Sequence, residues 1–385
     1  MLSHGRIADE LALAGHDVTL LEAEYFLKSS DLQSAKYAKT ISLGGFPRDL
    51  LTSAYSDLTA LSFSKTQGYF DNYHIFKKWH GGMNLLCEML LTKHNETLED
   101  LKEQKFDAIF NYHLNLCGTG LKEVLNIKTH FWISTCPIME YMAYILGVPT
   151  PTSYVPPLGK LVMSDKPTYA QRFLNILEYI TSVYTLETSA RGITDVYRKI
   201  FGPSFPDIEE VVKDSPITFI VADEVLDFPR PILHNTIFVG GLGFKNDTKE
   251  LQEPYLSEME KGRLAFITHG GYNSLYESAR AGVPIMIMPF FWDQFRNGKL
   301  AERNGWGLNF DKLSLLEGSE DFVTTLKLVL EDPKYYQQAQ RTKRLLLTKP
   351  FSGTDKFVKY TEYIALLKNI IYIILIIGQT YPHSH

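Results

Sequence analysis

Short apolar runs recur along the chain, and between them lie segments whose apolar residues are spaced three or four apart. The runs predict buried β-strands, and the spaced segments predict amphipathic helices. Predicted strands cover residues 17–22, 106–110, 129–134 and 215–222, and predicted helices cover residues 7–14, 117–125, 139–146 and 170–198. Strands that alternate with helices in this way are typical of an α/β domain with a parallel sheet.

Two further regions have distinct patterns. Residues 23–105 are predicted to be mostly helical or irregular, and they carry many aromatic side chains of the kind that more often form a core. Residues 317–330, 335–347 and 354–367 have helical spacing and are predicted to be the closing helices of the chain.

A second strand–helix–strand unit lies between these regions. Leu264–Ile267 is a short apolar run of the kind that forms a fully buried parallel strand. The turn Thr268–Gly271 breaks this run, and Asn273 or Ser274 can cap the helix that follows. That helix ends at a glycine, and Val283–Met288 is the next apolar strand. Such a unit has a right-handed crossover, so both strands end at the same edge of one sheet.

Polar residues gather where these two strands end. One cluster contains His269, Gly270, Gly271, Asn273 and Ser274, and the other contains Asp293, Gln294 and Asn297. Ligands of open α/β sheets bind at the carboxyl ends of the strands. Glycines let the backbone approach a phosphate closely, the N–H groups of a helix start attract an anion, and His269 can add a proton donor.

Other residues of the unit suit the rest of a nucleotide sugar. Glu277 lies one helical turn beyond Asn273 on the same face, where it can hold ribose hydroxyls. Asp293 and Gln294 offer an acceptor and a mixed amide, a combination suited to sugar hydroxyls. Each feature alone also has an ordinary explanation, because Gly-Gly turns are common in loops and an isolated histidine is more often structural. Together they predict a nucleotide or phosphate site.

The same residues carry a resemblance to a known family. The segment Phe266–Glu277, with Gly282–Pro284, Pro289–Gln294 and Asn297, resembles the donor-site signature of the UDP-glycosyltransferases. The resemblance is to the animal UDP-glucuronosyltransferase and UDP-glucosyltransferase type. It implies two Rossmann-like domains that face a cleft, the glycosyltransferase B arrangement. The amino-terminal domain would hold the acceptor and the carboxyl-terminal domain the UDP-sugar.

The resemblance also implies roles for individual residues. The donor site would consist of Thr268, His269, Gly270, Gly271, Asn273, Ser274, Glu277, Asp293 and Gln294. His269 and the glycines would bind the diphosphate, Glu277 would hold the ribose, and Asp293 with Gln294 would contact the sugar. UDP-glucuronate or UDP-glucose would be a co-substrate, and neither a further cofactor nor a metal ion is implied.

The catalytic pair of the family is altered in this chain. A doubly wound domain begins with a strand before helix 7–14, and relatives carry a general-base histidine just after that strand. We place the corresponding position upstream of Met1; His4 is the alternative base, or else a solvent-facing residue near a chain end. Relatives orient their histidine with a carboxylate. The corresponding residue here is Tyr112, which cannot carry a negative charge near neutral pH.

The donor domain is predicted to be incomplete. Such a domain needs two β-α-β-α-β halves, and the chain passes directly from Gly262 to the second half at Arg263. Relatives carry a serine-bearing phosphate loop and a Trp/Gln pair for uracil in the missing half. The break reflects either a skipped exon or fragmentary gene model, or a genuine short form.

These boundaries divide the chain into four parts. We expect residues 1–235 to form the acceptor domain without its first strand and residues 236–262 to form an interdomain linker. Residues 263–350 would form the partial UDP-sugar domain, and residues 351–385 a carboxyl-terminal helix and apolar tail.

Composition limits the classes of partner. The 385 residues have a net charge of −5 and scattered basic residues, which argues against nucleic-acid binding. Cys87, Cys117 and Cys136 have neither the spacing of metal ligands nor that of a disulfide framework, so we expect buried free thiols. Asn95–Thr97 and Asn246–Thr248 fit the glycosylation triplet, which matters only if the chain reaches a lumen.

Relatives reside on the lumenal side of the endoplasmic reticulum membrane, which they reach through a signal peptide and where a membrane anchor with a basic tail holds them. Residues 1–6 lack the apolar core of a signal peptide. Ile370–Ile377 is intensely apolar but shorter than the roughly 20 residues of a spanning helix. This segment is either a membrane span or an apolar segment that is buried or prone to aggregation.

Two hypotheses about function follow. The first is inverting transfer of a hexosyl group from a UDP-sugar to a hydroxyl of a small lipophilic acceptor. The second is a non-catalytic binding or regulatory protein of the same family, favoured by the missing base, by Tyr112 and by the missing uracil-binding half.

Overall fold

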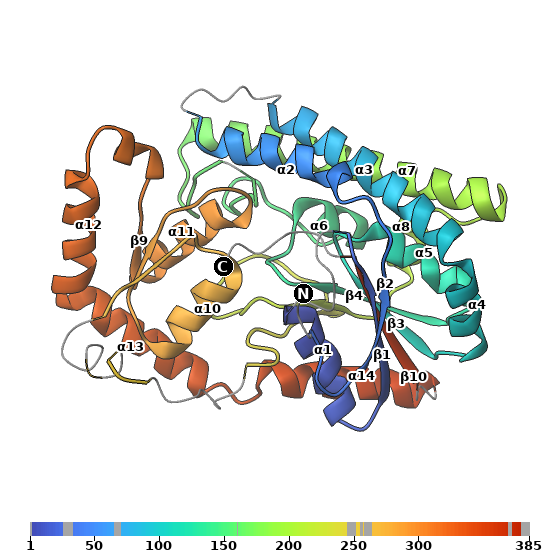
Figure 1. Ribbon diagram of the computed structural model, residues 1–385. Coiled ribbons are helices and arrows are strands. Elements are labelled where there is room, and N and C mark those ends of the chain that lie inside the picture. The colour runs from blue at the N-terminus through green and yellow to red at the C-terminus, as the bar shows by residue number, and fades with distance from the viewer. Residues whose placement is uncertain are drawn as a thin grey trace.

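A computed structural model describes residues 2–25, 34–64, 71–159, 161–244, 252–254, 257, 264–368 and 372–378 of the 385. The chain forms two parallel sheets with helices packed around them (Figure 1). The proposed break between Gly262 and Arg263 lies outside the described residues, as does the glycosylation triplet at Asn246.

The larger sheet has seven strands in the order β2-β1-β10-β3-β4-β5-β6, and every neighbouring pair is parallel. Its strands are β1 (Asp17–Ala23), β2 (Lys39–Leu43), β3 (Ala108–Tyr112), β4 (Thr129–Ser134), β5 (Thr218–Ile220), β6 (Thr236–Phe238) and β10 (Tyr372–Gly378). The predicted parallel sheet is therefore confirmed. Strand β2 was not predicted, because it is an edge strand with mostly exposed side chains.

Helices cover both faces of this sheet. One face packs against α1 (Leu2–Leu13) and α14 (Gly353–Lys368). The other face packs mainly against α3 (Asp71–Lys93), α5 (Leu116–Val124), α6 (Glu140–Leu146), α7 (Tyr169–Phe201) and α8 (Ile208–Lys213). Helix α2 (Asp49–Ser62) lies beside α3, and α4 (Asn95–Glu103) follows it. Because both faces are covered, strand side chains are buried on both sides, as in other all-parallel sheets.

The smaller sheet contains β7 (Phe266–Thr268), β8 (Ile285–Ile287) and β9 (Gly307–Asn309), all parallel. Its helices are α10 (Tyr272–Ala281), α11 (Asp293–Asn304), α12 (Glu320–Glu331) and α13 (Pro333–Leu347), with the short 3-10 helix η2 (Lys312–Leu316). Local sequence marks the helix ends: α10 ends at Gly282 in the left-handed conformation, and α13 begins at Pro333 after an Asp332 cap.

Strand β7 corrects one prediction. We expected Leu264–Ile267 to be fully buried, but Leu264, Phe266 and Ile267 are 39%, 38% and 42% exposed. β7 is an edge strand of the small sheet, paired with β8. Among the described residues, β7 has a paired neighbour on one side only, so its side chains are less covered than those of a central strand.

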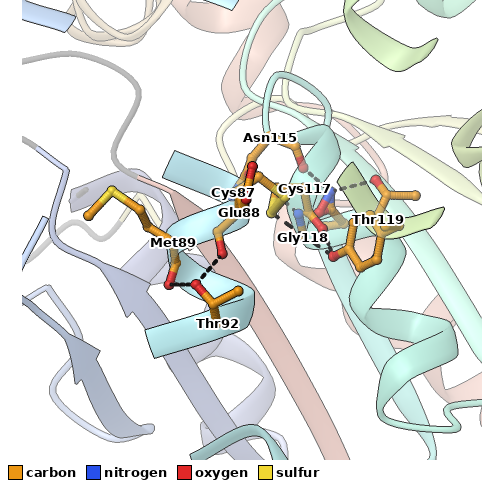
Figure 2. Close-up of a disulfide and its surroundings, with 10 residues drawn as sticks. Cys87, Glu88, Met89, Thr92, Asn115, Cys117, Gly118 and Thr119 are labelled. Atoms are coloured by element: carbon orange, nitrogen blue, oxygen red, sulfur yellow. Dashed lines mark hydrogen bonds between the residues drawn. A yellow bond between two sulfur atoms is a disulfide. The ribbon is translucent and has the colours of Figure 1, made fainter. Parts of the chain in front are cut away.

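The cysteines correct a second prediction. Cys87 and Cys117 form a disulfide, with their Cα atoms 5.6 Å apart (Figure 2). Cys87 lies on α3 and Cys117 on α5, 30 residues further along the chain, and both are buried. Spacing alone could not reveal this pair, because the packing of two helices on one sheet face brings the residues together. Cys136 is the one free thiol among the described cysteines, as predicted.

The carboxyl-terminal segment is not a separate tail. β10 lies between β1 and β3 in the large sheet, and Ile373–Ile376 are at most 2% exposed. The predicted domain 1–235 therefore includes residues from the other end of the chain, and β6 falls in the predicted linker 236–262. Within the described residues, no helix is long and apolar enough to cross a membrane.

Candidate functional site

The turn after β7 contains two successive glycines, and the first of them, Gly270, requires a residue without a Cβ atom. Gly270 has φ +83°, and a Cβ atom there would lie 2.4 Å from Cγ2 of Ile287. A Cβ atom on Gly271 would lie 2.6 Å from Nε2 of His269. Glycine alone allows this left-handed, closely packed turn. The Gly270 N–H donates to Oγ1 of Thr268 (3.3 Å), so the predicted residue Thr268 holds the turn.

Asn297 joins the two polar clusters predicted from the sequence. Its Nδ2 atom donates to the carbonyl oxygen of Gly270 at 2.9 Å and to Oδ2 of Asp293 at 2.8 Å. Its side chain is fully buried. The start of α11 is thereby tied to the glycine turn before α10, so the structure brings the two clusters together.

Asp293 is the acidic group of this junction. Burial raises the pKa of its carboxyl to about 6, and the side chain of Asn297 and the guanidinium of Arg296 oppose this rise. The backbone N–H of Tyr272, the first residue of α10, also opposes it by donating to the carboxylate. At neutral pH Asp293 is an ionised acceptor at the start of two helices, where negative charge is favourable.

The remaining predicted donor residues lie along α10 and the turn before it. His269 and Glu277 are exposed, and Asn273 and Ser274 are partly exposed. Although part of the His269 side chain is exposed, the protein around its ring reduces hydration of the charged form and lowers its pKa, so the ring is neutral at physiological pH and donates from only one nitrogen.

Gln294 is the second residue of α11, and its side chain is buried at 5% exposure. Its Oε1 atom accepts from the backbone N–H groups of Phe290 (2.8 Å) and Phe291 (3.2 Å). Its amide oxygen therefore shapes the loop Pro289–Trp292.

This loop also contacts the acceptor domain. Trp292 has φ +57°, a conformation that is strained for a residue with a Cβ atom. Its ring stacks on Phe76 of α3, with the centroids 6.0 Å apart, and Phe290 meets Phe63 edge-on at 5.5 Å. The strain is maintained by aromatic contacts from the other domain, which fixes the start of α11 relative to α3.

The two positions predicted for the catalytic pair are adjacent. His4, in the first turn of α1, contacts Tyr112 edge-on with ring centroids 4.6 Å apart. His4 is 6% exposed, so the alternative role of a solvent-facing residue is wrong. Tyr112 is 7% exposed, and its hydroxyl oxygen accepts from Oγ1 of Thr135 at 3.2 Å. An imidazole and a phenol therefore stand at the carboxyl end of β3.

A second histidine lies next to this pair. His113 is buried, and burial lowers its pKa to about 3. Its Nε2 atom is 3.0 Å from Sδ of Met139 and 3.6 Å from Sγ of Cys136. Burial, and secondarily the charge of Asp293, raises the pKa of the Cys136 thiol. The Cys136 thiol, two residues after the end of β4, is therefore protonated at physiological pH.

A buried ion pair joins the two domains behind the site. Nη1 of Arg296 lies 2.6 Å from Oδ1 of Asp227, and both side chains are almost completely buried. Nε of Arg296 donates to the carbonyl oxygen of Pro156 at 3.3 Å, and the guanidinium lies over the ring of Phe228. A guanidinium group can donate several hydrogen bonds at once and stack on an aromatic ring, so arginine is suited to this buried position between three partners.

Sequence reasoning placed Asn297 in a cluster but not in the predicted site, and it missed Thr135, Cys136 and the Arg296–Asp227 pair. The signal for Asn297 is its separation of four residues from Asp293, which puts the two on one helix face. The Arg296–Asp227 contact crosses between domains and has no local signal.

Comparison with known proteins places this chain in a family. The family model described as UDP-glucoronosyl and UDP-glucosyl transferase matches residues 1–264 and 260–369. The two matches meet where we predicted the break in the donor domain. The chain is 32% identical to ugt-47 of Caenorhabditis elegans, over 94% of this chain and 81% of that protein. It is 24% identical to human UDP-glucuronosyltransferase 1A3, over 94% and 80%. The first of these alignments spans 446 positions, so the relative carries residues that this 385-residue chain lacks.

Solved structures show the fold. SsfS6, a glycosyltransferase of Streptomyces sp. SF2575, matches with a TM-score of 0.56 at 12% identity, over 94% of this chain and 96% of its own. The spinosyn forosaminyltransferase SpnP matches with a TM-score of 0.53 at 14% identity, over 94% of both chains. The predicted fold class, α/β with two Rossmann-like domains of glycosyltransferase B type, is confirmed.

Proposed function

Because the chain belongs to the UDP-glucuronosyl and UDP-glucosyl transferase family, we propose that it transfers a glucosyl or glucuronosyl group from the UDP-sugar to a hydroxyl of a small lipophilic acceptor, with inversion. The observation that carries the proposal is the convergence of Gly270, Asn297 and Asp293 at the starts of α10 and α11. Two helix starts and a rigid glycine turn form a concentrated set of N–H donors for a diphosphate.

The chemistry follows from the positions of the side chains. The N–H groups at the start of α10 and the neutral ring of His269 stabilise the negative charge that develops on the departing diphosphate. The ionised carboxylate of Asp293 accepts hydrogen bonds from sugar hydroxyls. His4 lies at the end of the other sheet, where it takes the acceptor proton as general base.

Titration of UDP into the purified chain by calorimetry tests the donor site. We expect binding in the micromolar range that is abolished in His269→Ala and retained in His74→Ala, which removes an exposed histidine of α3. Equal binding by the two variants would contradict the assigned role of His269. No binding by the unmodified chain would contradict the donor site as a whole.

A second function has specific support in the structure. Tyr112 provides no charge to orient His4, and β7 is a partly exposed edge strand of the small sheet in the described part of the chain. Both features favour a binding protein without transfer activity. If UDP binds but neither hydrolysis of UDP-glucose and UDP-glucuronate nor transfer to phenolic acceptors is detected, the binding function is the correct one.

We propose that the protein resides on the lumenal side of the endoplasmic reticulum membrane. The Cys87–Cys117 disulfide supports an oxidising compartment, and Asn95 of the triplet Asn95–Thr97 is exposed at the start of α4. Expression in animal cells should give a protein whose mass falls on treatment with a peptide N-glycosidase, and the variant Asn95→Gln should lose this decrease at that site. An unglycosylated protein with reduced cysteines would contradict the location.

A further inference from the structure

Three side chains with nitrogen or sulfur donors meet at the carboxyl edge of the large sheet. Nε2 of His113 lies 3.0 Å from Sδ of Met139 and 3.6 Å from Sγ of Cys136. His113 is 3% exposed, whereas Cys136 and Met139 are partly exposed. This soft-donor cluster therefore combines a buried imidazole with two sulfur-bearing residues that solvent can reach.

The fold holds the three residues of the cluster in place. His113 follows β3 directly, and its backbone N–H donates to the carbonyl oxygen of Ile133 in β4 at 3.0 Å. Cys136 lies two residues after β4, where Oγ of Ser134 donates to its carbonyl oxygen (2.8 Å) and accepts from its backbone N–H (3.3 Å). Met139 is the residue that precedes α6. Two neighbouring strands and a helix start thus bring together residues that are 23 and 26 positions apart.

Hydrogen bonding accounts for only part of the cluster. If Nε2 of His113 carries a proton, that proton can point to Met139 or to Cys136, but not to both. If Nε2 carries none, its lone pair lies 3.0 Å from a thioether, which has no proton to donate. Each tautomer leaves one close contact without a hydrogen bond. A cation, in contrast, accepts electron pairs from an imidazole, a thiolate and a thioether at once.

The measured separations suit a single bound ion. In protein sites, bonds from a metal ion to nitrogen and sulfur are about 2.0 and 2.3 Å long. Two such ligand atoms at angles of roughly 90–120° around the ion lie about 3.0–3.7 Å apart. Both distances from Nε2 of His113 fall in this range. Thiolate and thioether ligands favour Cu⁺, whereas Mg²⁺ and Ca²⁺ require oxygen ligands.

We propose that His113, Cys136 and Met139 form a binding site for a soft monovalent cation, Cu⁺. On binding, the S–H bond of Cys136 breaks, a sulfur–copper bond forms, the proton passes to solvent, and the copper keeps its oxidation state. Nε2 of His113 and Sδ of Met139 contribute lone pairs. The ion joins the end of β3, the segment after β4 and the start of α6, so its binding stabilises this edge of the sheet. The site does not depend on the proposed glycosyl transfer.

Ag⁺, which has the same charge and soft character and no redox chemistry here, is the probe. It is titrated as the nitrate, without chloride or added thiol, against a chromophoric chelator. Cys87 and Cys117 form the disulfide, so Cys136 is the one free thiol among the three cysteines of the chain. Thermal unfolding followed by circular dichroism, and X-ray absorption of the Cu⁺ form, give readouts that do not depend on transferase activity.

We expect one ion per chain, a higher unfolding temperature with Ag⁺, and one nitrogen and two sulfur neighbours of copper at about 2.0 and 2.3 Å. Cys136→Ser should lower the affinity for Ag⁺ by at least about a hundredfold. Met139→Leu, a change that nearly conserves volume, should lower it by about tenfold. Met142→Leu removes a buried methionine of α6 outside the cluster and should leave the affinity unchanged.

Four results would overturn the proposal. The first is the absence of Ag⁺ binding by the unmodified chain. The second is an unchanged affinity in Met139→Leu together with a single sulfur neighbour of copper, because a lone thiol would then bind the ion. The third is an equal loss of affinity in Met139→Leu and Met142→Leu, which would indicate a general effect on packing. The fourth is tighter binding of Zn²⁺ than of Ag⁺, which would contradict a site for a soft monovalent cation.

Discussion

The side-chain amide of Asn297 donates to the carbonyl oxygen of Gly270 at 2.9 Å, although the two residues belong to different polar clusters of the sequence. Since Asn297 is fully buried and also holds Asp293, it couples the geometry of the glycine turn to that of α11. The donor site is therefore one unit whose parts cannot move independently.

Asn297→Ala should weaken UDP binding by about tenfold, equal to about 1.4 kcal/mol. The variant leaves the Gly270 oxygen and Asp293 without this donor, and an unsatisfied buried group costs about 1–3 kcal/mol. Calorimetry measures the change, and Lys299→Ala, two residues further along α11, is the control. Equal UDP affinities of the unmodified protein, Asn297→Ala and Lys299→Ala would show that the contact between the two polar clusters does not contribute to UDP binding.

Gly270→Ala should lower the free energy of unfolding by about 2–4 kcal/mol, because two costs add. The left-handed conformation costs an alanine roughly 1–2 kcal/mol, and the contact with Ile287 adds to this cost. Gly147→Ala isolates the conformational cost, since Gly147 has φ +70° but a Cβ atom added there would have no neighbour within 4 Å. Urea denaturation of both variants gives the comparison. A Gly147→Ala loss as large as that of Gly270→Ala would mean that the packing against Ile287 is unimportant.

Arg296→Met should destabilise the protein by about 3–5 kcal/mol, because it leaves the buried carboxylate of Asp227 unpaired. Arg303→Met is a close control: Arg303 also lies on α11 and over Phe228, but its ion pair with Asp165 is more accessible to solvent. That change should cost less than about 1 kcal/mol. Thermal unfolding at several salt concentrations distinguishes the two. Similar losses of stability in the two variants would indicate that burial does not make the Arg296–Asp227 pair more important for stability than the more accessible Arg303–Asp165 pair.

The raised pKa of Asp293 predicts that the stability of the protein falls, and its affinity for the UDP-sugar rises, as the pH increases through about 6. Its pKa is about 6 in the folded protein against an ordinary value of 3.8, so the folded state holds the proton more tightly. The stabilising contribution of the protonated form is therefore complete below pH 3.8 and is lost as the pH rises through about 6. Asp293→Asn should be more stable, relative to the unmodified protein, at pH 7.5 than at pH 4.5.

Donor binding should change in the other direction, since the ionised carboxylate accepts sugar hydroxyls. Affinity for the UDP-sugar should fall as the pH drops through about 6, and Asp293→Asn should lack this fall. Asp321→Asn, a change at an exposed position of α12, serves as the control in both experiments. A pH profile shared by Asp293→Asn and the unmodified protein would assign the titration to another group.

Reduction of the Cys87–Cys117 disulfide should lower the free energy of unfolding by about 3–4 kcal/mol, the loop-entropy value for a separation of 30 residues. The double variant Cys87→Ser, Cys117→Ser should show the same loss and no response to a reductant. The Cys136→Ser variant keeps the disulfide, so a reductant should lower its free energy of unfolding as in the unmodified protein. If the reductant leaves the unmodified protein unaffected, the disulfide does not contribute to stability.

The sequence by itself determined the parallel α/β class, most strands of both sheets and the turn at Gly270, because each depends on local periodicity or on a single backbone conformation. It also determined the two polar clusters, since residues after parallel strands meet at one edge. Only the tertiary structure decided the Cys87–Cys117 pair, the exposure of β7 and the bridging role of Asn297. These depend on which elements pack together.

The clearest case is Tyr372–Gly378. An apolar run of this length is compatible with a membrane segment, a buried helix or a strand, and its composition does not choose among them. The choice depends on β1 and β3, with which the segment pairs and which are far from it in sequence. Burial on both faces and backbone bonds on both sides then favour a central strand. Local sequence specifies what a segment can form, and distant partners decide which form it takes.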